Sequence, residues 1–180
     1  MKCYMDIIIM EDMFYNCMAL SSLNLSTSYT GSVNNINEMF YNCQNLSYLN
    51  IDNFNTSAII NMKNLFYGCQ SLVSLNLSNF ETQNVENMEG MFYNCFKLKT
   101  LDLSNFDAHN VTNMKNMFSY CREIIDLNLS GFDVEKVTSM ENMFKNCENI
   151  EFLNLSCFIT KEVITMKNMF SSCFSLKELY

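Results

Sequence analysis

The amino-acid sequence predicts an α/β solenoid of about seven coils of equal length. Three observations lead to this prediction: a cysteine recurs at one constant interval, a phenylalanine stands three residues before it, and the hydrophobic spacing changes within each repeat. A constant period without insertions indicates that each repeat is one structural unit, which buries its apolar face only against its neighbours. The repeated cysteines are Cys17, Cys43, Cys69, Cys95, Cys121, Cys147 and Cys173.

The segment before each cysteine is predicted to form a helix of about two turns. In one repeat Met114, Met117, Phe118 and Cys121 are spaced i, i+3, i+4 and i+7, which corresponds to one face of a helix. Six repeats place an N-cap type of residue before this segment: Asn35, Asn61, Asn87, Asn113, Ser139 and Thr165. Five repeats place Asn or Gly directly before the cysteine: Asn16, Asn42, Gly68, Asn94 and Asn146. These two residue types tolerate the left-handed conformation that ends a helix.

The segment after each cysteine is predicted to be a short strand. Leu127-Asn128-Leu129 alternates apolar and polar residues, so the leucines face inward and the asparagine faces outward. Strands of successive coils would pair as a parallel sheet on one side of the solenoid, with the helices on the other side. Because no linker or shift in composition interrupts the repeats, residues 1–180 are expected to form a single domain.

The repeated segment resembles a known sequence family. Val-Thr-Asn-Met-Lys-Asn-Met-Phe-Ser-Tyr-Cys (111–121), followed by Asp-Leu-Asn-Leu-Ser-Gly-Phe-Asp (126–133), is similar to the repeat of the BspA-like leucine-rich-repeat surface proteins of bacteria and some parasitic protists. The resemblance covers almost the whole chain. It implies a leucine-rich-repeat solenoid, a cell-surface or secreted location, a role in adhesion or host-factor binding, and no catalytic residues.

Composition and charge exclude several classes of protein. The chain carries 11 basic and 19 acidic residues, a net charge of −8, which argues against binding to nucleic acid. No apolar run approaches the roughly 18–20 residues that cross a bilayer, so no membrane insertion is expected. The apolar run at 7–10 is too short for the core of a signal peptide, and none is expected.

The cysteines raise the question of thiol chemistry. The repeated thiols follow a phenylalanine on the inward face, which favours reduced thiols buried in the core; a disulfide between coils is the alternative. Cys3 and Cys157 lie outside the repeated column, and Cys157 is predicted to be the most reactive thiol. The single histidine, His109, lies in a variable stretch and is expected at the surface. The sequence therefore indicates no enzyme, no metal site and no cofactor.

The candidate ligand-binding residues are the outward residues of the predicted strands, because the inward residues are committed to packing. They are Asn24, Tyr48, Asn50, Ser74, Asn76, Thr100, Asp102, Asp126, Asn128, Phe152 and Asn154. The Asn and Asp positions form either a hydrogen-bonded ladder of amides from coil to coil or a polar floor for glycans or peptides. The neighbouring positions vary, and Tyr48 and Phe152 are the expected aromatic anchors.

Two functions remain open from the sequence. The first is a non-enzymatic binding module, a surface adhesin or host-binding protein with a protein or glycan ligand. The alternative is a structural protein whose solenoids stack end to end, since neither end carries a polar cap and the coil with Phe170, Leu176 and Leu179 would expose apolar surface. A further column alternates in sign from coil to coil and is expected to form ion pairs: Lys63, Glu89, Lys115, Glu141 and Lys167.

Overall fold

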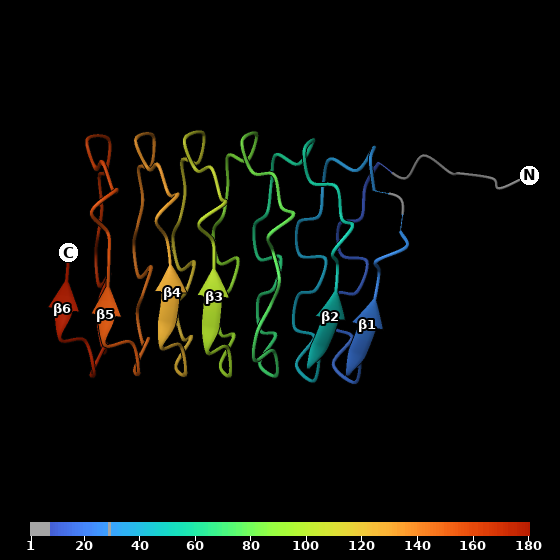
Figure 1. Cartoon of the computed structure of the whole chain (residues 1–180), viewed down its shortest axis with the longest axis horizontal. Coiled ribbons are helices and arrows are strands. Elements are labelled where there is room, and N and C mark those ends of the chain that lie inside the picture. Colours follow the sequence, from blue (N-terminus) through green and yellow to red (C-terminus); the bar gives the residue numbers. More distant parts are fainter. Residues whose placement is uncertain (1–7, 29) are drawn as a thin grey trace, which may run out of the picture.

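A computed structural model describes residues 8–28 and 30–180 of the chain. The chain is a solenoid whose coils lie side by side in a single row, from the coil with Cys17 at one end to the coil with Cys173 at the other (Figure 1). Hydrogen bonds and bridges join equivalent residues of neighbouring coils along the row, so the predicted repeat solenoid is confirmed as an architecture.

Short parallel strands line one side of the row (Figure 1). They are β1 (Ser22–Asn24), β2 (Tyr48–Asn50), β3 (Thr100–Asp102), β4 (Asp126–Asn128), β5 (Phe152–Leu153) and β6 (Glu178–Leu179). β1 pairs with β2, β3 with β4, and β5 with β6, in each case between equivalent residues of neighbouring coils. On the strand side, the bridge from Ser74 to Thr100 joins the coil between β2 and β3 to the coil that follows it. The strand side is therefore a series of short pairs on one face.

The predicted helices are wrong: the described residues contain no helix. The segment Met62–Cys69 shows the reason. Asn64 and Gly68 both have positive φ, +54° and +71°, and a left-handed residue every fourth position prevents a continuous right-handed helix. The residue before the cysteine does adopt the left-handed conformation, as expected, but it ends a turn rather than a helix.

Alternate backbone groups of this segment bond to the next coil instead of to their own. The N–H groups of Met62, Asn64, Phe66 and Gly68 donate to the carbonyl oxygens of Asn87, Glu89, Met91 and Tyr93 at 2.7–3.0 Å. Between them, Leu65, Tyr67 and Cys69 donate three residues back along the chain. The segment is thus a series of tight turns that bonds to the next coil as a parallel strand would. Just before this segment in each coil, one residue is bridged to its equivalent in the next coil, without a gap from Ile9 to Thr165.

The expected N-cap residues have a related role. The side-chain oxygen of Asn61 accepts the N–H of Lys63 at 2.9 Å, and Asn113 accepts the N–H of Lys115 at 3.0 Å. Each asparagine therefore closes a local turn at the point where a helix start was predicted.

The core is a set of stacked side-chain columns. The phenylalanines three residues before each cysteine form one stack from Phe14 to Phe170, with neighbouring ring centroids 5.5–5.7 Å apart. A second stack runs from Phe80 to Phe158 at 6.1–6.4 Å. Methionines and cysteines fill the space between the coils, and the interior ones are fully buried. The constant period is thus set by identical side chains packing on one another.

The alternating charges on the turn side form ion pairs between coils. Lys63 Nζ lies 3.3 Å from Glu89 Oε2, and Lys115 Nζ lies 3.1 Å from Glu141 Oε2. In both pairs the lysine belongs to one coil and the glutamate to the following coil, so the expected pairing is confirmed at these two steps.

Candidate functional site

The candidate site is the strand face, the outward side of β1–β6 and of Ser74–Asn76. The strands are extended, so alternate side chains point to opposite sides of the sheet. In β3 and β4 the middle leucine is buried, and the residues on either side of it are exposed. In these two strands the residues expected to face outward, Thr100, Asp102, Asp126 and Asn128, are exposed.

Two hollows on the strand face hold most of the candidate residues. The larger, of about 750 Å³, extends across the coils from Ser74 to Tyr180, and Thr100, Asp126 and Phe152 lie along it. The smaller, of about 270 Å³, lies around Tyr48. The larger hollow also contains Asp102, Asn128 and Asn154; the smaller contains Asn50; and both contain Ser74 and Asn76. Of the predicted residues, Asn24 alone is not part of either hollow.

The two expected aromatic anchors lie in different hollows. Phe152 is 54% exposed in the larger hollow, and Tyr48 is 53% exposed in the smaller one. Their large exposed rings are available for stacking on a ligand.

Besides the middle leucines, three residues of the hollows were missed by the sequence analysis: Ser47, Asp52 and Tyr180. Tyr180 lies in the larger hollow, one repeat period after Asn154, so it continues the Asn and Asp column. Extending the period to the last residue would have found it. Asp52 lies in the smaller hollow and belongs to the turn after β2, and no part of the period singled it out.

The Asn and Asp column differs from the expected amide ladder. Each side-chain oxygen accepts the backbone N–H two residues further along its own coil, at 2.9–3.1 Å; the six residues are Asn24, Asn50, Asn76, Asp102, Asn128 and Asn154. Asn76 also donates from Nδ2 to Asp52 Oδ1 at 3.0 Å. These bonds therefore close a turn at the end of each strand, and they hold the Asn and Asp side chains in one orientation.

The turn bonds also fix the charge of the face. The backbone N–H of Ser104 donates to Asp102 Oδ1 at 3.0 Å and lowers the pKa of the Asp102 carboxyl group. Asp102 is therefore ionised at neutral pH, and it shares the larger hollow with Asp126. The strand face thus combines amides and carboxylates with three aromatic rings, those of Tyr48, Phe152 and Tyr180.

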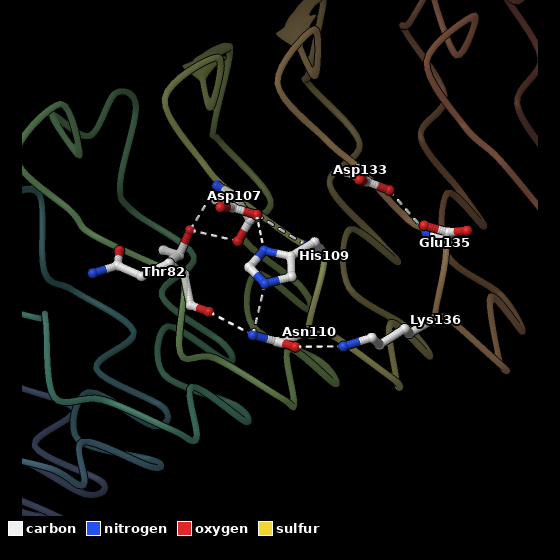
Figure 2. Close-up of polar contacts among 8 residues, drawn as sticks. Thr82, Asp107, His109, Asn110, Asp133, Glu135 and Lys136 are labelled. Carbon is white, nitrogen blue, oxygen red and sulfur yellow. Dashed lines mark hydrogen bonds and ion pairs between the residues drawn. The ribbon is translucent and has the colours of Figure 1, made fainter.

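His109 lies away from the strand face, in a turn between Phe106 and Val111. Its Nδ1 is 2.6 Å from Asp107 Oδ1 and its Nε2 is 2.9 Å from Asn110 Nδ2 (Figure 2). Lys136, from the following coil, donates to Asn110 Oδ1 at 2.7 Å (Figure 2). The side chain is half exposed, as expected, and its ring is held between two turn residues.

Thr82 of the preceding coil is hydrogen-bonded to this turn. The Asp107 N–H donates to Thr82 Oγ1 at 2.8 Å, and the Thr82 hydroxyl donates to the Asp107 carbonyl oxygen at 2.9 Å (Figure 2). Thr82 is buried, so this reciprocal pair satisfies polar groups inside the solenoid. The cluster is a structural connection between coils.

The repeated cysteines are free thiols among the described residues, as predicted. Each thiol from Cys43 onward donates to the carbonyl oxygen of the phenylalanine in the preceding coil, at 3.0–3.2 Å. Burial raises the pKa of Cys43 to about 11 and that of Cys121 to about 12. A buried, protonated thiol is a poor nucleophile, so this column is structural.

The accessible thiols differ in part from the prediction. Cys157 is half-buried, and its thiol donates to the Leu129 carbonyl oxygen at 3.3 Å. Cys17 is exposed and Cys173 is half-buried, so the prediction that the whole column is inaccessible is wrong at Cys17 and holds only in part at Cys173. Cys3 lies outside the described residues.

The described ranges hold no group of three or more His, Cys, Asp or Glu side chains arranged to bind a metal ion. Within 8–28 and 30–180 there is also no helix with the length and hydrophobicity to span a bilayer.

The fold and the strand face define a leucine-rich-repeat solenoid. The chain belongs to the family described as "Mycoplasma protein of unknown function, DUF285", whose sequence pattern matches residues 8–124 and 96–179. No curated protein sequence matches the chain.

Two solved structures have a similar fold. A leucine-rich cell surface protein from Faecalibacterium prausnitzii is 22% identical with a TM-score of 0.58, covering 89% of this chain and 38% of its own. A leucine-rich-repeat protein from Bacteroides ovatus is 14% identical with a TM-score of 0.55, covering 97% of this chain and 41% of its own. The chain thus spans about two fifths of each. The resemblance to BspA-like leucine-rich-repeat proteins is confirmed at the level of the fold.

Proposed function

We propose that this chain is a non-enzymatic binding module of a cell-surface protein, and that its strand face binds a glycan or an extended peptide. The main support for this proposal is that ten of the eleven outward residues selected from the sequence line two hollows on one face. A leucine-rich-repeat neighbour described as a cell surface protein supports the location.

The chemistry of the face supports a neutral or cationic ligand. Asp102 and Asp126 place carboxylates in the larger hollow, and the chain as a whole has a net charge of −8. An acidic ligand would be repelled, whereas sugar hydroxyls and peptide amides can bond to carboxylates and asparagine amides. Phe152 supplies a flat apolar surface on which a sugar ring or an aliphatic side chain can pack.

The test is a glycan and protein array probed with the chain and with a Tyr48→Ala/Phe152→Ala double variant. We expect saturable binding that the double variant weakens by about tenfold or more, because exposed aromatic anchors commonly dominate such interfaces. Ile60→Ala is the matched control, since Ile60 is also about half exposed (51%) but belongs to neither hollow. Binding that both variants weaken equally, or that neither weakens, would refute the assignment to the strand face.

A further inference from the structure

We propose that the strand face binds an arginine side chain of an extended peptide, with the guanidinium group stacked on Phe152 and paired with the carboxylate of Asp126. This inference rests on the proposed function of the strand face, and it names the class of ligand. Three observations support it: the carboxylates of the larger hollow have no ion pair, Phe152 lies between two acidic residues, and the chain already contains one contact of this kind.

The carboxylates of the larger hollow differ from most others of the chain. Outside the hollow, five glutamates pair with a lysine or arginine of a neighbouring coil: Glu89, Glu123, Glu141, Glu148 and Glu151. In the part of the chain that the structure describes, neither Asp102 nor Asp126 takes part in an ion pair, and no basic residue lines the larger hollow. The negative charge of the hollow is therefore complementary to a cationic group of the ligand.

Phe152 has an acidic residue in the coil on each side. It lies one repeat period after Asp126 and one before Glu178, so the three residues hold equivalent positions in β4, β5 and β6 (Figure 1). In the bonded pair β5 and β6, Phe152 is opposite Glu178, which sets the two backbones about 4.8 Å apart. On the other side, the core rings of Phe132 and Phe158 show that the coils of β4 and β5 are also in contact, with centroids 6.4 Å apart. Both acidic residues therefore lie one coil away from the exposed ring.

A guanidinium group fits this arrangement better than an ammonium group does. It is planar, so it can stack within about 6 Å of the centroid of an aromatic ring while its N–H edge donates to a carboxylate. The ring of Phe152 is 54% exposed and open to such stacking. A lysine ammonium is a compact and strongly hydrated charge, and it cannot make the stacked contact and the paired contact with one flat group.

The same three-part contact occurs inside the chain. Arg122 lies over the rings of Phe96 and Tyr120, with its central carbon 5.6 and 5.9 Å from their centroids. Its Nε lies 3.3 Å from Oε1 of Glu148, which belongs to the next coil. The spacing of the coils thus suits an arginine that stacks on one coil and pairs with the next. On the strand face the ring and the carboxylate are present, and the arginine would come from the ligand.

The surroundings of Phe152 favour a peptide over an isolated cation. The larger hollow, of about 750 Å³, crosses five coils from Ser74 to Tyr180. Four coil steps of about 4.8 Å correspond to about five or six extended residues. The side-chain oxygen of Asn154 accepts from the N–H of Ser156, which holds the amide in place and leaves its nitrogen to donate to a peptide carbonyl oxygen.

The first test compares three hexapeptides by NMR titration of the 180-residue chain. Each is acetylated, amidated and made of serines around one central residue, which is arginine, lysine or citrulline. Citrulline has nearly the shape of arginine without its charge. We expect the arginine peptide to bind about fivefold or more tightly than either of the others, because it alone combines stacking with an ion pair. Its affinity should fall as salt is added.

The second test uses variants that keep the shape of the face. Asp126→Asn removes the charge, and Phe152→Leu keeps an apolar side chain without the ring. Each should weaken binding of the arginine peptide by about fivefold or more and reduce its advantage over the lysine peptide. Glu135→Gln and Phe174→Leu are the matched controls, since both residues are exposed and belong to neither hollow. Melting curves check that all four variants are folded.

The results that would overturn the proposal are distinct from failure of the proposed function. An arginine peptide that does not bind at millimolar concentration, a citrulline peptide that binds as well, or equal effects of Asp126→Asn and Glu135→Gln would each exclude the arginine site. If array ligands still bind through Tyr48 and Phe152 in that case, only the class of ligand is wrong. If no array ligand binds either, the binding function of the strand face fails with it.

Discussion

The thiol of Cys121 donates a hydrogen bond to the carbonyl oxygen of Phe92, in the preceding coil, at 3.1 Å. The same bond recurs at five other cysteines, so each thiol satisfies a carbonyl group of the preceding coil at the edge of the phenylalanine stack. A cysteine is suited to this place because it is small and apolar, yet still carries a weak donor.

Reactivity with a bulky thiol reagent should separate the cysteines into classes. In the folded chain, Cys17 should react first because it is exposed, and Cys157 should follow more slowly. The fully buried thiols should react only as the chain unfolds: Cys43, Cys69, Cys95, Cys121 and Cys147. All nine should be titrated in denaturant without reductant, and a smaller number would show disulfides.

Stability should fall at alkaline pH because of the same column. Unfolded thiols ionise near pH 9, whereas burial holds the pKa of Cys43 at about 11 and that of Cys121 at about 12. Between these values the folded chain binds more protons than the unfolded chain, so the free energy of unfolding decreases as pH rises. Melting temperature and thiolate absorbance should therefore change together from about pH 9 to about pH 11. Ionisation of the five buried thiols at pH 9 without loss of structure would contradict the burial.

The phenylalanine stack should dominate the packing energy. Phe118 is fully buried between Phe92 and Phe144, with ring centroids 5.5 and 5.6 Å away. Phe118→Ala should lower the free energy of unfolding by about 3–5 kcal/mol, which urea denaturation would measure. Phe174→Ala is the control, because Phe174 is largely exposed and its removal leaves no cavity. Similar losses for the two variants would mean that the stack contributes little.

The ion pair of Lys115 and Glu141 should contribute a small, salt-dependent stability. Both side chains are partly exposed, so the pair is worth about 0–1 kcal/mol. Lys115→Glu should lower the melting temperature at low salt, with a loss that shrinks as ionic strength rises. Adding Glu141→Lys should restore much of the original stability. A loss of equal size at all salt concentrations would indicate a change in packing instead.

The sequence predicted the repeat, the core columns and the outward residues, because all of these follow from one constant period. It predicted the turn side incorrectly, since Met114, Met117, Phe118 and Cys121 have helical spacing. That spacing arises here because the side chains pack on the equivalent side chains of adjacent coils. The information that excludes a helix was local: Asn116, in the middle of the segment, has a φ of +59°.

The strand face illustrates a second limit of the sequence. The position of Asn128 was correctly predicted, but its bonding was not, because an outward asparagine can bond either to the next coil or to its own turn. The N–H of Ser130 lies close enough for the second option, at 3.1 Å. The available signal was the Asn or Asp itself, since these side chains commonly accept the backbone N–H two residues further along the chain.

The left-handed residues of the turn segment give the last prediction. Asn116 has positive φ, and its side-chain oxygen accepts from Nδ2 of Asn142 in the next coil at 3.1 Å. Asn116→Ala should cost about 1–2 kcal/mol, because alanine is disfavoured in the left-handed region and the bond between coils is lost. Asn116→Gly loses the same bond without the backbone cost, so it should be the less destabilising change. Urea denaturation of the two variants separates the backbone cost from the cost of the lost side-chain hydrogen bond. If glycine were as costly as alanine, the side-chain bond would be decisive; if alanine were the more stable variant, the segment would be helical in solution and the turn structure would be wrong.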